Sequence, residues 1–412
     1  MSTTPHVVIL AGGLSHERDV SLRSGRRVAE ALRSAGVSVD VLDVDANLIP
    51  RLKSQQPDLV WPLLHGASGE DGSLRDILEL LDIPYLGTRP RESRVAWNKP
   101  VAKSVLSAAG VATPAYVTLP QSLFRELGAK SVMEAVVEKI GLPLVVKPAR
   151  GGSALGVTYV EDASRLPQAF VDCFAYSDLA LIEKAVVGTE VAVSVVETTS
   201  GIKALPPVEI VAEGPYDYDA RYNPGRVQYF TPARFDEAGT AAVQDVAISA
   251  HKALGLRHIS RTDLIVDAQG VIWFLEVNVA PGMTETSLLP QSILASGEHL
   301  SDVYLSWVKA ILAGDSPVTS EEPISAGAAV GAALSSEDLS LASEDEAAAV
   351  AGSPVVQSAG SAASAESAVS AVSAPSAVSA DSASSTVEES TAKPAEPTAP
   401  AVEDYMRGSE LF

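Results

Sequence analysis

The segment Phe274-Leu275-Glu276-Val277-Asn278-Val279-Ala280-Pro281-Gly282-Met283 follows Arg261-Thr262-Asp263-Leu264-Ile265-Val266 after a short turn that begins at Asp267. Both segments have the apolar character of buried strands, yet each carries polar residues two positions apart. Because residues i and i+2 of a strand point to the same face, Glu276 projects together with Asn278, and Arg261 together with Asp263. If the strands pair, one sheet face gathers two carboxylates, an amide and a guanidinium.

This set of side chains indicates a metal or phosphate site. Carboxylate and amide oxygens suit Mg²⁺ that carries nucleotide phosphates, and a nearby arginine suits a developing anion. The alternative for Glu276 alone is a solvated hairpin face. Burial of an unpaired carboxylate between apolar neighbours such as Phe274 and Val277 is costly, and the two polar pairs together favour the site.

The composition of the 412 residues separates a folded part from a tail. From about Gly314 the chain is rich in Ala, Ser, Val, Glu and Pro and lacks large apolar side chains, which predicts disorder. The tail carries more than half of the formal net charge of −22. The folded part is only mildly acidic, which excludes the basic face expected of a protein that binds nucleic acid.

Cysteine content and apolar runs bear on the compartment. Cys173 is the single cysteine, so an internal disulfide is excluded and a reducing compartment is favoured. The run Val7-Val8-Ile9-Leu10 is too short for a secretory signal or a membrane span. We therefore expect a cytoplasmic protein without a membrane span.

Strands and helices alternate in the first hundred residues, which predicts a parallel sheet with helices on its faces. The expected strands are residues 6–10, 37–42 and 59–64, and the first helix is expected over residues 21–35. The middle of the chain has an α+β pattern. Residues 215–229 form a polar, Tyr-rich connection without periodicity, and a loop of this length is usually functional or disordered.

Several glycine-rich turns lie where a strand ends. Glycine allows backbone amides to approach an anion closely, and the start of a helix after such a turn attracts anions. The pattern of a P-loop is absent. Each turn taken alone is compatible with an ordinary strand-turn-strand or a strand-end histidine. The turns are residues 13–21, residues 65–73 around His65, residues 147–156 after Lys147, and residues 183–190 between two glutamates.

The order of these motifs closely resembles the D-alanine–D-alanine ligases of the ATP-grasp superfamily, over about residues 6–311. The resemblance implies a mixed α/β and α+β fold, with a three-domain ATP-grasp architecture, an N-terminal Rossmann-like domain and a disordered C-terminal tail. The implied boundaries are residues 1–101, 102–185, 186–314 and 315–412. The motifs that carry it are Gly12-Gly13 with Glu17 and Val20-Ser21, His65-Gly66 with Gly69-Glu70-Asp71-Gly72, Lys147-Pro148 with Gly152-Ser153, Tyr216-Asp217-Tyr218 with Tyr222, Arg261-Thr262-Asp263, and Glu276-Val277-Asn278 with Pro281-Gly282-Met283-Thr284.

The resemblance also implies how ATP and metal ions are bound. Lysines are expected to bind the phosphates of ATP, and a glycine-rich loop is expected to close over them. The base and the ribose are expected to bind at the end of the strand that precedes residues 183–190. Two Mg²⁺ ions, for which Mn²⁺ is a possible substitute, are expected on the strand face described above. The implied nucleotide-binding residues are Lys99, Lys147, Gly152, Glu183, Lys184, Val186, Glu190 and Arg221, and the implied metal ligands are Asp263, Glu276 and Asn278.

For the amino acids, the resemblance implies that Glu17 binds the ammonium of the first D-alanine and is hydrogen-bonded to Ser153 and Tyr222. His65 is expected near the carboxylate of that D-alanine. The guanidinium of Arg261 and the amide of Gly282 are expected to stabilise the oxyanion that forms during acyl transfer. Ser287 is expected to bind the carboxylate of the second D-alanine. A homodimer that supplies a precursor of peptidoglycan is also implied.

The chain departs from the pattern of that family at four positions. Gly151 stands in place of Glu, Ala154 in place of Ser, Arg221 in place of Lys and Asn98 in place of Asp. Arginine keeps the charge of lysine but not its geometry. Two alternatives therefore stay open: a ligase that joins D-alanine to D-lactate or D-serine, and an ATP-binding regulatory module with reduced catalysis.

Overall fold

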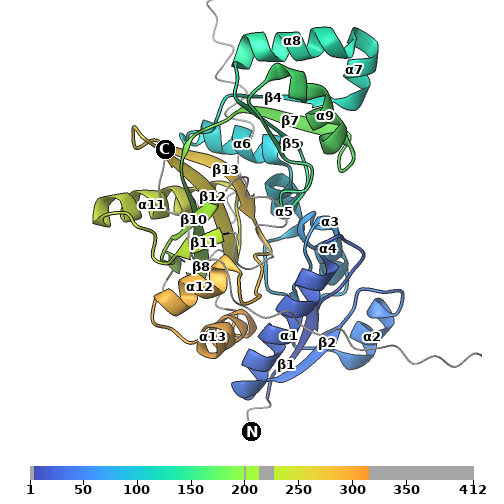
Figure 1. The fold of residues 1–412 in the computed structure, drawn as a ribbon. Coiled ribbons are helices and arrows are strands. Elements are labelled where there is room, and N and C mark those ends of the chain that lie inside the picture. The colour runs from blue at the N-terminus through green and yellow to red at the C-terminus, as the bar shows by residue number, and fades with distance from the viewer. Residues whose placement is uncertain (1–3, 199–200, 213–226, 315–412) are drawn as a thin grey trace, which may run out of the picture. The chain divides into compact units, whose positions relative to one another are not determined.

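A computed structural model describes residues 4–198, 201–212 and 227–314 of the chain. The expected tail and the Tyr-rich connection with Arg221 and Tyr222 lie outside the described residues. The described part contains three β-sheets with helices between and around their strands (Figure 1). No helix in those three ranges is long and apolar enough to cross a membrane.

The N-terminal sheet has three parallel strands in the order β2-β1-β3. Its central strand alternates between two cores, because successive strand residues face opposite sides. Val7 and Ile9 pack with residues of α1 and α13, whereas Val8 and Leu10 pack with residues of α2 and α4. The elements are β1 (His6–Leu10), α1 (Arg18–Ser34), β2 (Ser38–Leu42), α2 (Leu48–Gln55), β3 (Leu59–Pro62), α3 (Ala67–Glu70), α4 (Ser73–Leu80), α5 (Pro90–Trp97) and α6 (Lys99–Ala108).

The second sheet is antiparallel and has the order β4-β7-β5-β6. Helices α8 and α9 supply Val136, Phe170 and Cys173 to the core on this sheet. The glycine-rich residues 149–157 connect β5 to β6. The elements are β4 (Tyr116–Pro120), α7 (Gln121–Leu127), α8 (Ala129–Ile140), β5 (Leu144–Pro148), β6 (Thr158–Val160), the 3₁₀ turn η1 (Ala163–Arg165), α9 (Leu166–Phe174) and β7 (Leu179–Lys184).

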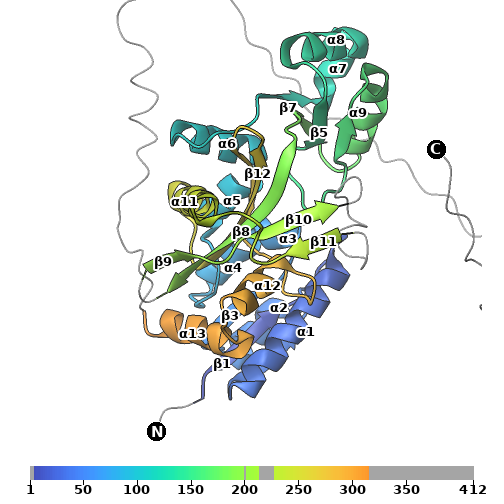
Figure 2. The ribbon, with the colours of Figure 1, turned by 60° about the vertical axis from the view of Figure 1, so that its left-hand side comes forward.

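The third sheet is antiparallel, with the order β11-β10-β8-β12-β13 and β9 paired to β8. Helices α11 and α6 pack on one face of it, and α12 contacts β8 and β10 (Figure 2). The elements are β8 (Gly188–Thr198), β9 (Gly201–Ala204), β10 (Val208–Ala212), β11 (Val227–Phe230), α11 (Glu237–Ala253), β12 (Ile259–Asp267), β13 (Ile272–Asn278), α12 (Leu288–Ala295) and α13 (Leu300–Leu312).

The sequence predicted the strands of the N-terminal sheet within two residues, but it placed two helix starts too late. The first helix begins at Arg18 rather than Ser21. The apolar pattern of residues 243–254 predicts a second helix, α11, which begins at Glu237 rather than Val243, because Asp236 accepts a hydrogen bond from the amide of Gly239 and so caps the helix. In both cases the apolar periodicity starts later than the helix itself.

Trp61 of β3 joins the N-terminal sheet to the last helix and provides a test of this packing. Its ring lies edge-on to Tyr304, with ring centroids 5.3 Å apart, and 5.9 Å from that of Trp307. Trp61 is 1% exposed. We expect Trp61→Ala to lower the free energy of unfolding by about 3–5 kcal/mol, since it removes a large buried side chain and leaves a cavity. Urea unfolding measures this change.

The control is Leu80→Ala, since Leu80 is also a large apolar residue of this region but is 78% exposed. Its expected change is within about 0.5 kcal/mol. Equal effects of the two substitutions would contradict the role of Trp61 in this packing.

Candidate active site

Two neighbouring pockets contain most of the predicted site residues that the structure describes. The first pocket is lined by Glu17, His65, Glu70, Ser153, Arg261, Asn278, Gly282 and Ser287, among others. The second is lined by Lys147, Glu183, Lys184, Val186 and Glu190, among others. Both are bordered by Lys99, Gly151, Gly152, Asp263 and Glu276. We call these five shared residues the junction.

The paired strands β12 and β13 form one wall of the junction. Asp263 lies opposite Glu276, and Arg261 lies opposite Asn278, so the four side chains share one face of the antiparallel sheet, as the sequence pattern predicted for paired strands. The register then shifts by one residue after Asp263, so the sheet has a bulge beside these carboxylates. Bulges commonly redirect side chains next to active sites.

Each carboxylate of this wall is held by a cation of the chain itself. Arg261 donates to both oxygens of Asp263, from Nε at 2.7 Å and from the terminal nitrogen at 2.8 Å. The Nζ of Lys99 lies 3.2 Å from Oε2 of Glu276. Cations therefore already meet both carboxylates at the point where the two pockets join.

The same wall offers a set of donor atoms that fits a hard divalent cation. Two carboxylates and the amide oxygen of Asn278 are the oxygen ligands that Mg²⁺ prefers. The Oδ1 of Asn278 also accepts a hydrogen bond of 2.7 Å from the amide of Ala280, which fixes the orientation of the side chain. The described ranges contain no group of three or more His, Cys, Asp or Glu suited to a metal, so any ion here would need the amide oxygen or ligands from its substrate.

The glycine loop between β5 and β6 lines both pockets with Gly151 and Gly152. The Nζ of Lys99 donates to the carbonyl of Gly151 at 2.6 Å. Ser153 has a φ of +51° and its hydroxyl donates to Oε1 of Glu17. A Cβ at Gly152 would lie 3.2 Å from the carboxylate of Glu17, so this position favours glycine. The structure thus brings together Glu17 and Ser153, the contact that the family resemblance implied.

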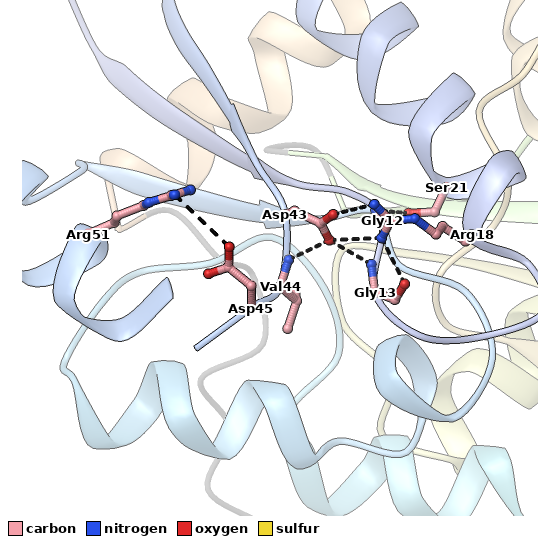
Figure 3. A network of polar contacts seen from close by, with 8 residues as sticks. All are labelled: Gly12, Gly13, Arg18, Ser21, Asp43, Val44, Asp45 and Arg51. Atoms are coloured by element: carbon pink, nitrogen blue, oxygen red, sulfur yellow. Dashed lines mark hydrogen bonds and ion pairs between the residues drawn. The ribbon is translucent and has the colours of Figure 1, made fainter. Parts of the chain in front are cut away.

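The turn that carries Glu17 is fixed by a network around Asp43 (Figure 3). Oδ1 of Asp43 accepts hydrogen bonds from the amides of Gly13 and Val44, both at 2.8 Å. Arg18 donates to both carboxylate oxygens of Asp43, and also to the carbonyl of Gly13 at 2.8 Å. The hydrogen bond from Arg18, aided by the backbone amides, lowers the pKa of Asp43 to about 2.

Glu70 is a buried acid beside Glu17 that sequence reasoning left without a role. It is 6% exposed, and its Oε1 accepts a hydrogen bond of 3.0 Å from the amide of Gly66. Burial, together with the negative charge of Glu17, raises the pKa of Glu70 to about 8. The first pocket therefore holds a carboxyl group that is mostly protonated at neutral pH.

His65 connects the first pocket to the loop after β13. Its Nδ1 lies 3.1 Å from the carbonyl of Ala280 and must be the donor, because a carbonyl oxygen only accepts. Burial lowers the pKa of His65 to about 4. The imidazole is therefore neutral at pH 7, with its proton on Nδ1.

The loop after β13 is tightly packed around Gly282 and Ser287. A Cβ at Gly282 would lie 2.7 Å from Oγ of Ser287. The same Oγ accepts a hydrogen bond of 2.9 Å from the amide of Thr284. The amide of Met283 donates to Oγ of Ser24 at 3.1 Å, which ties this loop to α1.

A buried carboxylate, Glu183, lines the second pocket. Glu183 is 2% exposed and forms ion pairs with Lys147 and with Lys103, a residue that the sequence analysis did not select. Lys103 lies one helical turn after Lys99, so a lysine on the apolar face of a helix was the available signal. The Nζ of Lys184 donates to the carbonyl of Leu142 at 2.6 Å, while its side chain borders the pocket.

The network around Asp43 predicts a pH-dependent contribution to stability. A carboxyl whose pKa is lowered stabilises the fold above its unfolded pKa, near 4, and loses this effect as the pH falls through the folded value of about 2. We expect Asp43→Asn to lower the free energy of unfolding by about 1 kcal/mol at pH 6, since the partly exposed pair is screened by solvent. The difference from the native protein should shrink between pH 4 and pH 2.

Chemical denaturation at several pH values measures this difference. Asp45→Asn is the matched control, because the neighbouring Asp45 lies 4.0 Å from Arg51 in a more exposed pair (Figure 3). A constant difference for Asp43→Asn down to pH 2 would contradict the assignment.

Comparison with known proteins agrees with this geometry. The family described as "D-ala D-ala ligase C-terminus" matches residues 105–309. A D-alanine–D-alanine ligase of Anaeromyxobacter dehalogenans is 41% identical over 300 residues, which cover 73% of this chain and 94% of that protein.

Two solved structures are also similar to this chain. The D-alanine–D-alanine ligase of Bacillus anthracis complexed with ATP has a TM-score of 0.62 and 27% identity, and the match covers 76% of this chain and 98% of that one. The VanG D-Ala:D-Ser ligase of Enterococcus faecalis has a TM-score of 0.63 and 25% identity, with coverage of 75% and 100%. These similarities confirm the ATP-grasp fold class. The chain belongs to the D-alanine–D-alanine ligase family.

Proposed function

We propose that this protein joins two molecules of D-alanine to D-alanyl-D-alanine with consumption of ATP, and so supplies a precursor of peptidoglycan. The observation that carries the proposal is the junction, where two pockets with different linings share a lysine, two carboxylates and a glycine loop. A reaction that transfers phosphate from a nucleotide to an amino acid needs such an arrangement, because both substrates must meet at one point.

The first step is the activation of one D-alanine. Its carboxylate oxygen attacks the γ-phosphorus of ATP, the bond from this phosphorus to the bridging oxygen breaks, and ADP leaves. Lys99 and Lys147 are placed to neutralise the phosphate charge in this step, and Arg221 of the undescribed connection is expected to assist. Asp263, Glu276 and Asn278 would hold two Mg²⁺ or Mn²⁺ ions, which supply further neutralisation of the phosphates.

The second step is the transfer of the acyl group. The amine of the second D-alanine attacks the acyl carbon, a proton leaves the nitrogen, and phosphate departs with its bonding electron pair. The guanidinium of Arg261 and the amide of Gly282 are proposed to stabilise the oxyanion, and Ser287 to bind the second carboxylate. Loss of one such donor typically costs about 3–4 kcal/mol of barrier lowering. The closed glycine loop excludes water, which would otherwise hydrolyse the acylphosphate.

Nucleotide binding is assigned to the second pocket. Glu183 and the backbone near Val186, with Lys184 beside them, are proposed to contact adenine, and Glu190 the ribose. Glu17 is proposed to bind the ammonium of the first D-alanine, held by Ser153 and by Tyr222 of the undescribed connection. The neutral His65 offers no charge to a carboxylate, and its bond to Ala280 suits it better to hold the loop of Gly282.

The cellular setting and the oligomeric state are proposed from the family. A cytoplasmic homodimer is proposed on this basis. The mass of the purified protein in solution, measured by light scattering, tests the dimer.

The main alternative is a ligase that joins D-alanine to a different acceptor, because the VanG D-Ala:D-Ser ligase is among the similar structures. Phosphate release with ATP and D-alanine, followed by mass spectrometry of products when D-lactate or D-serine competes, tests the proposal. D-alanyl-D-alanine as the dominant product supports it. If D-alanyl-D-lactate or D-alanyl-D-serine dominates instead, the acceptor is D-lactate or D-serine. ATP binding without phosphate release would favour a regulatory module.

The metal assignment predicts the effect of a neutral substitution at the junction. We expect Glu276→Gln to lower phosphate release at least 100-fold at low Mg²⁺, since a formal charge is lost at a ligand of the phosphate-bound ion. The melting temperature should fall modestly rather than collapse, because Lys99 loses the charge of Glu276 but keeps its hydrogen bond to the carbonyl of Gly151. Glu285→Gln, an exposed carboxylate of the nearby loop, is the control. Equal turnover of both variants at limiting Mg²⁺ would show that Glu276 is not a metal ligand.

The role of Glu17 predicts a change in substrate affinity. The amide of Glu17→Gln keeps the size of the side chain but loses the charge-assisted hydrogen bond to an ammonium, a loss of about 1.5–3 kcal/mol or roughly 10–100-fold. We therefore expect KM for the first D-alanine to rise by this factor. Asp19→Asn, on the exposed face of the first turn of α1, should leave it unchanged. Initial rates over a wide range of D-alanine concentration separate the two subsites.

A further inference from the structure

Glu183 is shared by two lysines that come from different elements. Lys147 lies on β5 and Glu183 on the adjacent antiparallel strand β7, where Lys147 pairs with Leu181. Their side chains share one face of the sheet, since Leu181 and Glu183 are two residues apart. Lys103 approaches from α6, and its Nζ lies 3.0 Å from Oε2 of Glu183, whereas Lys147 pairs with Oε1.

The two lysines differ in their access to the second pocket. Lys147 and Glu183 both line this pocket, whereas Lys103 does not and its side chain is fully buried. The Nζ of Lys103 also donates to the carbonyl of Phe274 at 3.1 Å. It lies 5.9 Å and 5.7 Å from the ring centroids of Tyr116 and Phe274, within the range of cation–π attraction. Lys103 is therefore fixed behind Glu183, where a ligand in the pocket does not touch it.

The charges of both lysines favour the ionised form of Glu183. Burial opposes the ionisation of Glu183, but the charges of Lys147 and Lys103 overcome it and hold the pKa of Glu183 below its ordinary value. Burial lowers the pKa of Lys103 to about 8, against the opposing effect of the Glu183 charge. At pH 7 Glu183 is thus a carboxylate and Lys103 an ammonium group. If one lysine leaves, the other still pairs with the carboxylate.

Lys147 has a second task in the proposed function, on which the following inference rests. ATP phosphates in the second pocket would compete with Glu183 for the Nζ of Lys147. We propose that Lys103 is a positioning residue that acts as the permanent counter-charge of Glu183, so that Lys147 can leave Glu183 and bind the phosphates of ATP. Without Lys103, the departure of Lys147 would strand a buried carboxylate, which is strongly unfavourable. Lys147 would then stay on Glu183.

Helix α6 therefore carries two cations with separate tasks. Lys99, at its first position, reaches the junction and contacts Gly151 and Glu276. Lys103, one turn later on the same side, reaches the back of Glu183. Both contacts join α6 to the second sheet and to β13, so the nucleotide pocket is held from behind by one helix.

The test is a double-mutant cycle with Lys103→Met and Lys147→Met. We expect K103M to raise KM for ATP at least tenfold and to change KM for D-alanine by less than twofold. The cost of K147M in KM for ATP should be smaller in the K103M background than in the native protein, because Lys147 is then already retained by Glu183. If the two costs simply multiply, Lys103 does not release Lys147 and the inference is wrong.

Two further variants separate this role from structural support alone. Arg257→Met removes a partly buried cation, which donates to the carbonyl of Gly87 and stacks on Tyr85 and lines neither pocket. It should lower the melting temperature but leave KM for ATP unchanged. Lys103→Gln keeps a hydrogen-bond donor without the charge and serves if K103M does not fold. It should show the same antagonism with K147M, and independent costs would again overturn the inference.

The native protein distinguishes failure of this inference from failure of the proposed function. If it neither binds ATP in calorimetry nor releases phosphate, the assignment of nucleotide binding to the second pocket is wrong, and so is the inference that rests on it. If it does bind ATP and the costs of the two substitutions multiply, only the role of Lys103 falls.

Discussion

Charges buried in this protein must have partners, and this constraint determines how its three sheets meet at the site. Glu17 of the N-terminal region meets Ser153 of the second sheet. Glu276 of the third sheet meets Lys99 of α6, which also holds the loop of the second sheet through the carbonyl of Gly151. An unpaired buried charge is far more costly than a paired one, so these contacts act together to bring the three sheets to one point.

The same pairs imply that substrate binding is an exchange of partners. Arg261 rests on Asp263, Lys99 on Glu276 and Lys147 on Glu183. Each of these cations is also one that the proposed reaction directs to a phosphate or an oxyanion. Internal pairing keeps these groups oriented before the substrates arrive, so little reorganisation is needed during the reaction. Lys103 differs because it does not line the second pocket and therefore cannot contact a ligand there.

The local pattern of the sequence predicted the parts of the site that lie within a strand or a turn. The two-residue spacing in β12 and β13 predicted the face with Asp263 and Glu276, and it needed only that the strands pair. The residues that were missed depend on distant contacts. Lys103 and Glu70 acquire their roles through burial beside Glu183 and Glu17, which no short window of sequence contains. The elements β4, α7 and α8 were missed as well, although Gly128 and Gly141, both with positive φ, mark the ends of the two helices.

The departures of the glycine loop from the family pattern can be judged by which atoms the loop uses. Its contact with Lys99 is made by the carbonyl of Gly151, which every residue type possesses. Its contact with Glu17 is made by the hydroxyl of Ser153, which the chain retains. Neither contact needs a side chain at position 151 or a hydroxyl at Ala154. The loop can therefore close on Glu17 without the two missing groups, which favours an active ligase over a module that has lost catalysis.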